Sequence, residues 1–230
     1  MTSPWQEATV IEVRRETPNA KTFRLRLTTP MTHLAGQYYV VRLTAPDGYR
    51  AQRSYSVASM PGGDEIDLTV ELFPEGEVSG FLHEVVVPGD TLEVRGPIGG
   101  FFAWAGDTPA LGVAGGSGVV PLMSMLRHAR AIGHPERLKL IVSARRPADL
   151  YYADELVGPE TTVVYTRQAP PGDPRPPARL SAEDLKPLLD GAPRTVFVCG
   201  TPGFCDTATD RLIELGVGTD RIRVERFGPT

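Results

Sequence analysis

The stretch GVAGGSGVVPLMSML, residues 112–126, sets the architecture of the second half of the chain. A short apolar strand pattern runs into a glycine turn at 115–118. A helical pattern then begins near Val119, with Pro121 in its first turn, where proline is tolerated. Glycines at a helix start let backbone N–H groups approach phosphate oxygens, aided by the helix dipole. The alternative is a tight turn whose glycines serve geometry only. The pattern predicts a strand–turn–helix unit and favours a phosphate site at its turn.

Strands and helices continue to alternate from about residue 108 to the end of the chain. This alternation predicts a parallel sheet with helices on both faces. The Pro-rich segment APPGDPRPPAR fits neither element and is expected to be a surface loop. Helices are expected at 119–133, 148–158, 181–190 and 204–216, and strands at 138–145, 161–167, 194–200 and 221–227.

The first half shows a different pattern, with short alternating runs separated by turn clusters such as TPNA, APDG and PGGDE. Six such runs predict a small six-stranded antiparallel β-barrel, interrupted by one short helix at 78–86. The strands are expected at 8–16, 21–27, 36–43, 51–57, 65–73 and 90–96. We therefore predict two domains, a barrel at 1–104 and an α/β domain at 105–230.

Composition excludes several classes of function. A net charge of −4 argues against nucleic acid as the main partner. No apolar run is long enough to span a membrane, and the N-terminus lacks a signal-peptide pattern, so we expect a cytoplasmic protein, monomeric in solution. The two cysteines, Cys199 and Cys205, cannot supply an iron–sulfur cluster or a structural zinc site, and the four histidines form no ligand pattern. We expect no bound metal.

Residues 53–59, RSYSVAS, are unusual for a strand that should help to fill a core. Alternation places Arg53 and Tyr55 on one face and Ser54 and Ser56 on the other. Arg53 and Tyr55 lie roughly 6.6 Å apart along a strand, so they could meet a phosphate and a flat heterocycle of one long ligand. Alternatively, Arg53 is a surface charge and Tyr55 a residue of the barrel edge.

Two further motifs lie where strands end. In PEGEVSGFLHE, residues 74–84, Gly76 and Ser79 precede a short helix, with Ser79 expected near its N-cap. This is either ordinary capping or a second phosphate site. In FVCGTPGF, residues 197–204, Cys199 and Gly200 end a parallel strand, where α/β sheets bind ligands, although Cys199 could simply be a small buried residue.

Together, and in this order, the motifs resemble those of the ferredoxin–NADP reductase family. RSYSVAS resembles the R-x-Y-S-x-x-S flavin motif, and GEVS the family's second FAD phosphate loop. GPIGGFF resembles the closing strand segment, GGSGVVP the G-x-G-x-x-P pyridine-nucleotide loop, and CGTPGF the turn beside the nicotinamide. The resemblance covers nearly the whole chain. It implies an FAD-binding barrel, a Rossmann-like NAD(P)-binding domain, and hydride transfer between them.

The resemblance also implies roles for individual residues. Arg53 would hold the FAD pyrophosphate, Tyr55 would stack on the isoalloxazine, and Ser56 would hydrogen-bond near the hydride-accepting N5. Phe227 is the expected cover of the other flavin face. The residues implied at the cofactors are Arg53, Ser54, Tyr55, Ser56, Val70, Leu72, Gly76, Val78, Ser79 and Phe227 for FAD, and Gly116, Gly118, Pro121, Cys199 and Gly200 for the dinucleotide. Ser56, Cys199 and Glu225 are the expected catalytic residues.

Two sequence features bear on the electron donor and the acceptor. Arg145 and Arg146 follow one strand, and Thr166 and Arg167 the next, which favours the 2′-phosphate of NADPH, with NADH possible. The cysteine count excludes a fused [2Fe–2S] domain, so we expect a separate carrier such as ferredoxin, flavodoxin or an oxygenase component. The alternatives are a diffusible acceptor such as free flavin or quinone, or a flavin-binding subunit without turnover of its own.

Overall fold

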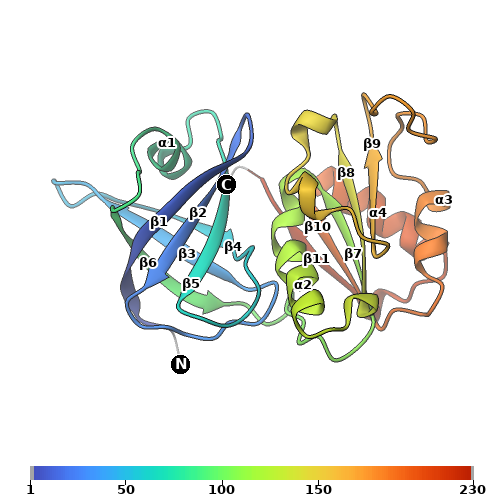
Figure 1. Cartoon of the computed structure of the whole chain (residues 1–230), viewed down its shortest axis with the longest axis horizontal. Helices are drawn as coiled ribbons and strands as arrows, with labels where there is room; N and C mark the ends of the chain where they lie inside the picture. Colours follow the sequence, from blue (N-terminus) through green and yellow to red (C-terminus); the bar gives the residue numbers. More distant parts are fainter. Residues whose placement is uncertain (1–2, 229–230) are drawn as a thin grey trace.

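Two sheets of different construction lie side by side in a computed structural model that describes residues 3–228 (Figure 1). The first sheet has six antiparallel strands in the order β4-β3-β6-β1-β2-β5, and the second has five parallel strands in the order β11-β10-β7-β8-β9. The predicted fold class, an antiparallel six-stranded barrel followed by a parallel α/β sheet, is confirmed.

The barrel closes where its two edge strands meet. Val57, directly after β4, bridges Leu68 of β5, and the N–H of Ala58 donates to the carbonyl of Asp67 (2.8 Å). Alternating apolar residues such as Phe23 and Val94 fill the interior. The elements are β1 (Trp5–Thr17), β2 (Ala20–Leu27), β3 (Tyr38–Thr44), β4 (Arg50–Ser56), β5 (Glu65–Glu71), α1 (Glu77–Glu84) and β6 (Thr91–Ile98).

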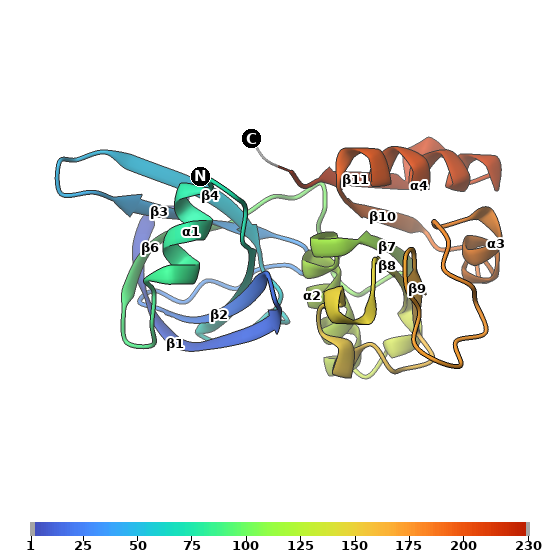
Figure 2. The same cartoon turned by 90° about the horizontal axis from the view of Figure 1, so that it is seen from above.

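The second sheet is covered on both faces, and its three central strands are accordingly nearly all apolar. Helix α2 lies between this sheet and the barrel (Figures 1 and 2), while α3 and α4 pack on the other face. All strands are parallel, so their carboxyl ends meet at one edge. The elements are β7 (Ala110–Gly115), α2 (Val119–Ala131), β8 (Leu138–Ala144), β9 (Thr161–Tyr165), α3 (Ala182–Leu185), β10 (Thr195–Gly200), α4 (Pro202–Glu214) and β11 (Ile222–Arg226).

The helix predicted at 148–158 is wrong. The segment forms two single 3₁₀ turns, Pro147–Asp149 and Ala153–Glu155, and Tyr152 between them has a left-handed φ of 54°. Leu150, Tyr151, Tyr152 and Leu156 are buried in the cluster that contains α2, whereas Val157 is exposed. The predicted helix at 181–190 is also shorter, because Pro187 limits α3 to one turn followed by a 3₁₀ turn.

Phe102 and Trp104 lie just before the predicted domain boundary and pack in the cluster that contains α2. The boundary between residues 104 and 105 stays a prediction. Within residues 3–228, no helix is long and apolar enough to cross a membrane. The same residues contain no group of three or more His, Cys, Asp or Glu side chains arranged to hold a metal ion.

Candidate functional site

Strand β4 carries the first half of the candidate site. Arg53 and Tyr55 pair in register with Val41 and Tyr39 of β3, so both lie on the face that continues the barrel interior. Arg53 is exposed; its guanidinium donates to the carbonyl of Gln52 (2.8 Å) and forms no ion pair within residues 3–228. It is therefore available to an anion.

Tyr55 is half-buried against the barrel core. Burial raises the pKa of its hydroxyl, an effect that the charge of Arg53 partly opposes, so the phenol stays neutral at physiological pH. Ser54 and Ser56 lie on the opposite face of β4, as alternation predicted: Ser54 is exposed and Ser56 is buried, in register with Tyr38. The Tyr55 ring therefore lies on the same face of β4 as Arg53, and the buried Ser56 hydroxyl lies on the other face.

The start of α1 lies against β4 and offers backbone donors. Gly76 is the N-cap, and no side chain caps the helix, so its first amides have no side-chain acceptor. A Cβ at Gly76 would collide with Ser79 Oγ and lie 3.2 Å from the carbonyl oxygen of Phe73. Tyr49, a residue that the sequence analysis missed, donates from its hydroxyl to the carboxylate of Glu77 (3.0 Å) in the first turn.

Ser79 lies in the first turn of α1, near the N-cap as predicted, but its side chain does not cap the helix. Ser79 is three residues inside the helix, where its hydroxyl accepts from the N–H of Phe73 and donates to the carbonyl of Gly76 (both 3.3 Å). It shapes the turn from within. Val70 and Val78 are each 1% exposed in the barrel core, so their side chains do not face this opening. Leu72, just after β5, lines a groove of about 540 Å³ beside the turn, together with Phe73 and Phe81.

The glycine turn of the second domain packs on the end of β10. A Cβ at Gly118 would lie 2.6 Å from the amide nitrogen of Gly200 and would collide with the carbonyl of Cys199, so only glycine fits. Gly116 has a left-handed φ of 57°, and a short 3₁₀ turn, Gly116–Gly118, leads directly into α2. Pro121 is buried in the first turn of α2, as predicted.

Phe204 forms a floor under both glycine segments. Cβ atoms at Gly115 and Gly200 would lie 2.5 Å and 2.7 Å from its ring. The sequence analysis quoted this phenylalanine only as part of CGTPGF. Phe204 contacts these glycines because α4 packs against the end of β10. The local sequence pattern does not predict this tertiary contact.

Cys199 and Glu225 are register partners in the parallel pair β10 and β11. Cys199 is fully buried; burial raises the pKa of its thiol well above the ordinary value, and the nearby Glu225 adds to this, so the group stays protonated. Glu225 is half-buried, and burial raises its pKa to about 7. The N–H of Phe227 donates to the carbonyl of Gly200 (2.8 Å), which brings these four predicted residues together at one strand edge.

The residues predicted to contact a 2′-phosphate lie together after β8 and β9. The N–H of Thr166 donates to the carbonyl of Ala144 (2.9 Å), and that of Arg167 to the carbonyl of Arg145 (3.0 Å). Arg145, Arg146 and Arg167 are exposed; Arg146 pairs with Asp149 (3.2 Å). This cationic corner shares the carboxyl edge of the sheet with the glycine turn.

The two halves of the site approach each other through the end of the chain. In both views the segment that follows β11 leaves the second sheet on the side of the barrel (Figures 1 and 2). The Phe227 ring is partly buried against the cluster that contains α2. The arrangement therefore joins an anion- and ring-binding strand to a dinucleotide-type turn across the domain interface.

Comparison with known proteins identifies both halves. Residues 7–102 match the family described as the oxidoreductase FAD-binding domain, and residues 113–210 match the oxidoreductase NAD-binding domain. The chain therefore belongs to the ferredoxin–NADP reductase-like flavoproteins, in which an FAD-binding domain is joined to an NAD-binding domain. The resemblance predicted from the motifs is confirmed.

Relatives and solved structures agree with this assignment. The chain is 31% identical over 223 residues to the reductase component of phenol 2-monooxygenase from Pseudomonas sp. (strain CF600), covering 91% of this chain and 62% of the relative. The flavohem-like FAD/NAD-binding domain of nitric oxide dioxygenase from Vibrio cholerae superposes with a TM-score of 0.85 at 22% identity, covering 97% and 99% of the two chains. A ferredoxin NADP⁺ reductase from Neisseria gonorrhoeae, with bound FAD and NADP, gives 0.77 at 21%, covering 96% and 98%.

The chain spans 51–69% of the length of the eight curated relatives compared here. FAD nevertheless fits the barrel site by chemistry. The Arg53 guanidinium, which forms no ion pair within residues 3–228, suits a pyrophosphate. So do the first amides of α1, which no side chain of the described residues caps. In the second domain, the open position is Gly116, where a Cβ would meet nothing within 4 Å, and the turn there leads directly into the amides at the start of α2.

Proposed function

We propose that the chain takes electrons from NADPH through FAD to a separate one-electron carrier, such as a ferredoxin, a flavodoxin or an oxygenase component. The observation that carries this proposal is the pairing, in one molecule, of an exposed arginine and a half-buried tyrosine on β4 of the barrel with a glycine turn at the carboxyl edge of a parallel sheet. The name of the phenol 2-monooxygenase reductase component supports the choice of acceptor class. We also propose that the FAD-binding domain comprises residues 1–104 and the NAD(P)-binding domain residues 105–230. That the protein is monomeric and cytoplasmic stays a prediction.

Bound FAD supplies the conversion of a two-electron hydride into single electrons. The barrel residues bind and orient it. Arg53 and the first amides of α1 hold the pyrophosphate, and Tyr55 presents its ring to the isoalloxazine. Ser56 offers a hydroxyl at the hydride-accepting nitrogen. Ser54 and Leu72 line the approach.

The second domain orients the nicotinamide. Gly116, Gly118 and Pro121 shape the turn that receives the pyrophosphate, and Cys199 and Gly200 close the wall beside the ring. A thiol whose pKa is raised by burial stays neutral, so Cys199 excludes water and packs rather than acting as a nucleophile. Glu225, with its pKa near 7, can give or accept a proton at physiological pH. Phe227, partly buried against the cluster that contains α2, would cover the flavin face that the nicotinamide must reach.

The choice of NADPH rests on charge. Arg145, Thr166 and Arg167 meet at the carboxyl ends of β8 and β9 through the hydrogen bonds described above, and guanidinium groups favour a 2′-phosphate over a bare hydroxyl. Arg146 contributes less, because Asp149 already neutralises it.

Anaerobic reduction tests the proposal. Purified protein reconstituted with FAD is mixed with NADPH or NADH, and flavin absorbance near 450 nm is followed by stopped flow; we expect loss of absorbance, faster with NADPH. Reduced protein is then offered ferredoxin, flavodoxin, free flavin and quinone in separate reactions. A protein that binds no FAD, or a flavin that neither nucleotide reduces, contradicts the proposal. Reoxidation by free flavin or quinone alone would replace the protein acceptor with a diffusible one.

Cys199→Ala separates orientation from binding. The variant should retain FAD but reduce it more slowly, because the wall beside the nicotinamide loses its side chain. Cys205→Ala, on α4, is the matched control, since Cys205 is buried in the neighbouring cluster. Equal flavin reduction rates in Cys199→Ala and wild type would restrict Cys199 to packing.

A further inference from the structure

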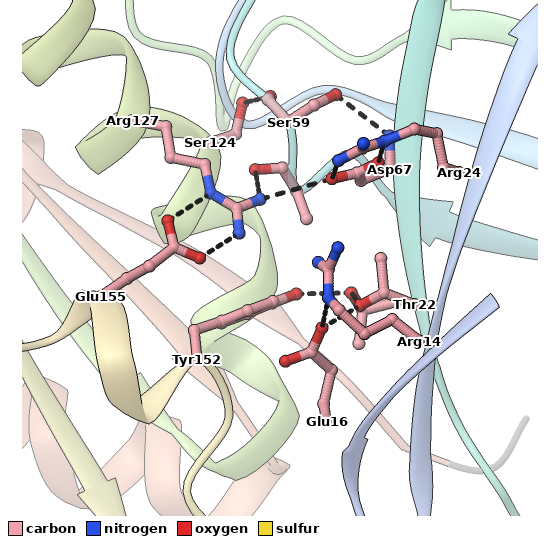
Figure 3. Close-up of polar contacts among 12 residues, drawn as sticks. Arg14, Glu16, Thr22, Arg24, Ser59, Asp67, Ser124, Arg127, Tyr152 and Glu155 are labelled. Atoms are coloured by element: carbon pink, nitrogen blue, oxygen red, sulfur yellow. Dashed lines mark hydrogen bonds and ion pairs between the residues drawn. The ribbon is translucent and has the colours of Figure 1, made fainter. Parts of the chain in front are cut away.

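Helix α2 is tied to the end of the flavin-binding strand segment by two side chains. Arg127 donates from Nη1 to the carbonyl of Ala58 (2.8 Å), and Ser124 donates from Oγ to the carbonyl of Ser59 (2.6 Å) (Figure 3). Ala58 and Ser59 are the last two residues of the RSYSVAS motif. Helix α2 of the second domain is thus hydrogen-bonded to the end of the RSYSVAS motif of the barrel.

Arg127 is itself held in place on both sides of the interface. It forms a two-point pair with Glu155 (2.9 and 2.5 Å), lies 3.9 Å from the Asp67 carboxylate of the barrel, and stacks its guanidinium 5.0 Å from the Tyr152 ring centroid. Its side chain is only 15% exposed, and that of Asp67 6%. Glu155 is 39% exposed, so only the arginine side of the two-point pair is buried; a two-point pair between an arginine and a carboxylate still fixes geometry better than a single surface contact does.

A second polar chain crosses the same interface beside Arg127 (Figure 3). The Tyr152 hydroxyl is 2.5 Å from Thr69 Oγ1, Thr69 is 2.6 Å from Thr22 Oγ1, and Thr22 donates to Glu16 (2.7 Å). Tyr152 holds the left-handed backbone conformation that is rare for a bulky residue, and this conformation accompanies its contact with the barrel. The second domain therefore meets the barrel through an ordered network, not a loose contact.

This network is connected to both cofactor turns by short, stiff segments. Arg127 lies nine residues beyond Gly118 along one helix, roughly 13 Å. On the barrel side, Ala58 lies two residues beyond Ser56, roughly 6.6 Å along an extended chain. No flexible loop stands between the dinucleotide turn and the residue expected at the flavin nitrogen.

We propose that Arg127, assisted by Ser124, is a positioning residue that sets the distance between the nicotinamide and the flavin. This inference rests on the proposed function. NADPH and FAD, when bound, would supply the chemistry: the nicotinamide would lose a C–H bond with both electrons and the flavin would gain an N–H bond, with one further proton from water. The residues of this chain would hold the two groups at the distance that this transfer needs. Such transfer needs reacting atoms about 3–3.5 Å apart, and a misplacement of about 1 Å can cost on the order of 100-fold in rate.

Arg130 provides a matched control on the same helix. It lies three residues beyond Arg127 and forms its ion pair with Glu160 of its own domain (2.7 Å from Nε), and no hydrogen bond from its side chain to the barrel is found within residues 3–228. Its side chain is 31% exposed. Arg130→Met therefore removes a guanidinium and an ion pair from α2 without touching the tie to the barrel.

The experiment compares wild type, Arg127→Met, Arg127→Lys, Ser124→Ala and Arg130→Met as FAD-loaded full chains. Stopped-flow flavin reduction gives the limiting rate, the nucleotide dependence gives the apparent Kd, and 4-deuterated NADPH gives the isotope effect. Hydrogen exchange of peptides covering residues 53–60 reports the tie without requiring turnover.

We expect Arg127→Met to slow the limiting rate about 10- to 100-fold at nearly unchanged nucleotide Kd and FAD content, with a larger isotope effect. Arg127→Lys should recover part of the rate, Ser124→Ala should lose a few-fold, and Arg130→Met should match wild type. Exchange within 53–60 should rise in Arg127→Met but not in Arg130→Met. Equal rates and equal exchange in Arg127→Met and Arg130→Met would overturn the proposal.

If Arg127→Met does not fold, Arg127→Lys and Ser124→Ala carry the test, and wild-type rates and exchange in both would overturn it. If neither nucleotide reduces the wild-type flavin, the proposed function fails, and exchange then decides the tie alone: a selective rise in Arg127→Met supports it, and no difference refutes it.

Discussion

The turns before α1 and α2 both use glycine at a helix start, yet they are built from different surroundings. At Gly76 the space for a Cβ is taken by the hydroxyl of Ser79, a side chain of the same helix. At Gly118 it is taken by the backbone of β10, a separate strand. Three of the eight residues of α1 are buried, against nine of the thirteen of α2.

This difference indicates that a substitution in the α1 turn should have local effects, whereas one in the α2 turn should affect other elements of the fold. The α1 turn is a local feature of the barrel, and a side chain can move aside there. The α2 turn is joined to the end of β10 at one side and, through Arg127, to the barrel at the other. A substitution in the α2 turn should therefore lower the stability of the protein, weaken nucleotide binding and change how the two domains are positioned.

The largest effect is expected from Gly118→Ala. The new methyl would meet backbone atoms of Cys199 and Gly200 that cannot move without distorting β10, an overpacking cost of about 1–3 kcal/mol or more. We expect the Tm to fall by about 5 °C or more and NADP⁺ affinity to drop. Differential scanning calorimetry and nucleotide titration measure both.

The controls for this prediction sharpen the comparison. Gly203→Ala in α4, where a Cβ meets nothing within 4 Å, should leave the Tm nearly unchanged. Gly76→Ala should cost less than Gly118→Ala, and adding Ser79→Ala should recover part of that loss. If Gly76→Ala destabilises as much as Gly118→Ala, the distinction between the two turns is wrong.

Arg53→Met should come next, and it tests the barrel turn as an FAD site. Losing one charge-assisted contact to the pyrophosphate costs about 1.5–3 kcal/mol, which raises the Kd for FAD roughly 10- to 150-fold. Flavin fluorescence on titration measures this. Arg50→Met removes an exposed arginine from the start of the same strand, opposite Thr44, and should leave the Kd within about two-fold. Equal weakening in both variants would mean that general charge, not Arg53, binds FAD.

Arg167→Glu should give a selective effect on the nucleotide. Reversing the charge beside Thr166 and Arg145 should lower kcat/KM for NADPH about 10- to 100-fold while changing that for NADH far less, because only NADPH carries the 2′-phosphate. Arg179→Glu, an exposed arginine in the Pro-rich loop, controls for net charge. Parallel losses for the two nucleotides would remove the 2′-phosphate assignment.

The sequence was informative where a local rule decides the structure. Strict alternation placed Arg53 and Tyr55 on one face of β4, and the register with Val41 and Tyr39 confirms it. Strand–helix alternation likewise predicted the parallel sheet. The glycine turn was recognisable because its glycines sit between a strand and a helix, where few other residues can be accommodated.

Tertiary contacts decided what the sequence could not. Ser79 looked like an N-cap, but Gly76 takes that place, and the Ser79 hydroxyl donates to the Gly76 carbonyl instead. Residues 148–158 have helical spacing, yet Tyr152 turns left-handed to meet Thr69. Arg127 resembles any surface arginine of an amphipathic helix until the barrel packs against it.

The smallest expected effect is the pH dependence of the Tm that Glu225 of the second domain causes. Glu93 of the barrel provides the comparison. Burial raises the folded-state pKa of Glu225 from 4.5 to about 7, so between these values the native protein binds more protons than the unfolded chain. Its contribution to stability therefore falls as pH rises through that window, and the cost is complete above about pH 7. Glu225→Gln removes this dependence, so the Tm of the variant minus that of wild type should rise by ~1–3 °C between pH 5 and pH 8.

Glu93 of β6 should behave in the opposite way, because the hydrogen bond from Arg42 lowers its pKa. The stabilisation from ionised Glu93 is present above its unfolded pKa and is lost as the pH falls. Glu93→Gln should therefore lower the Tm, relative to wild type, more at pH 8 than at pH 4. Tm measured across pH 4–8 for both variants compares the two slopes directly. Slopes of the same sign would show that Glu225 is not held in a desolvated site beside Cys199, and its assignment as a proton-exchanging group would fall with that result.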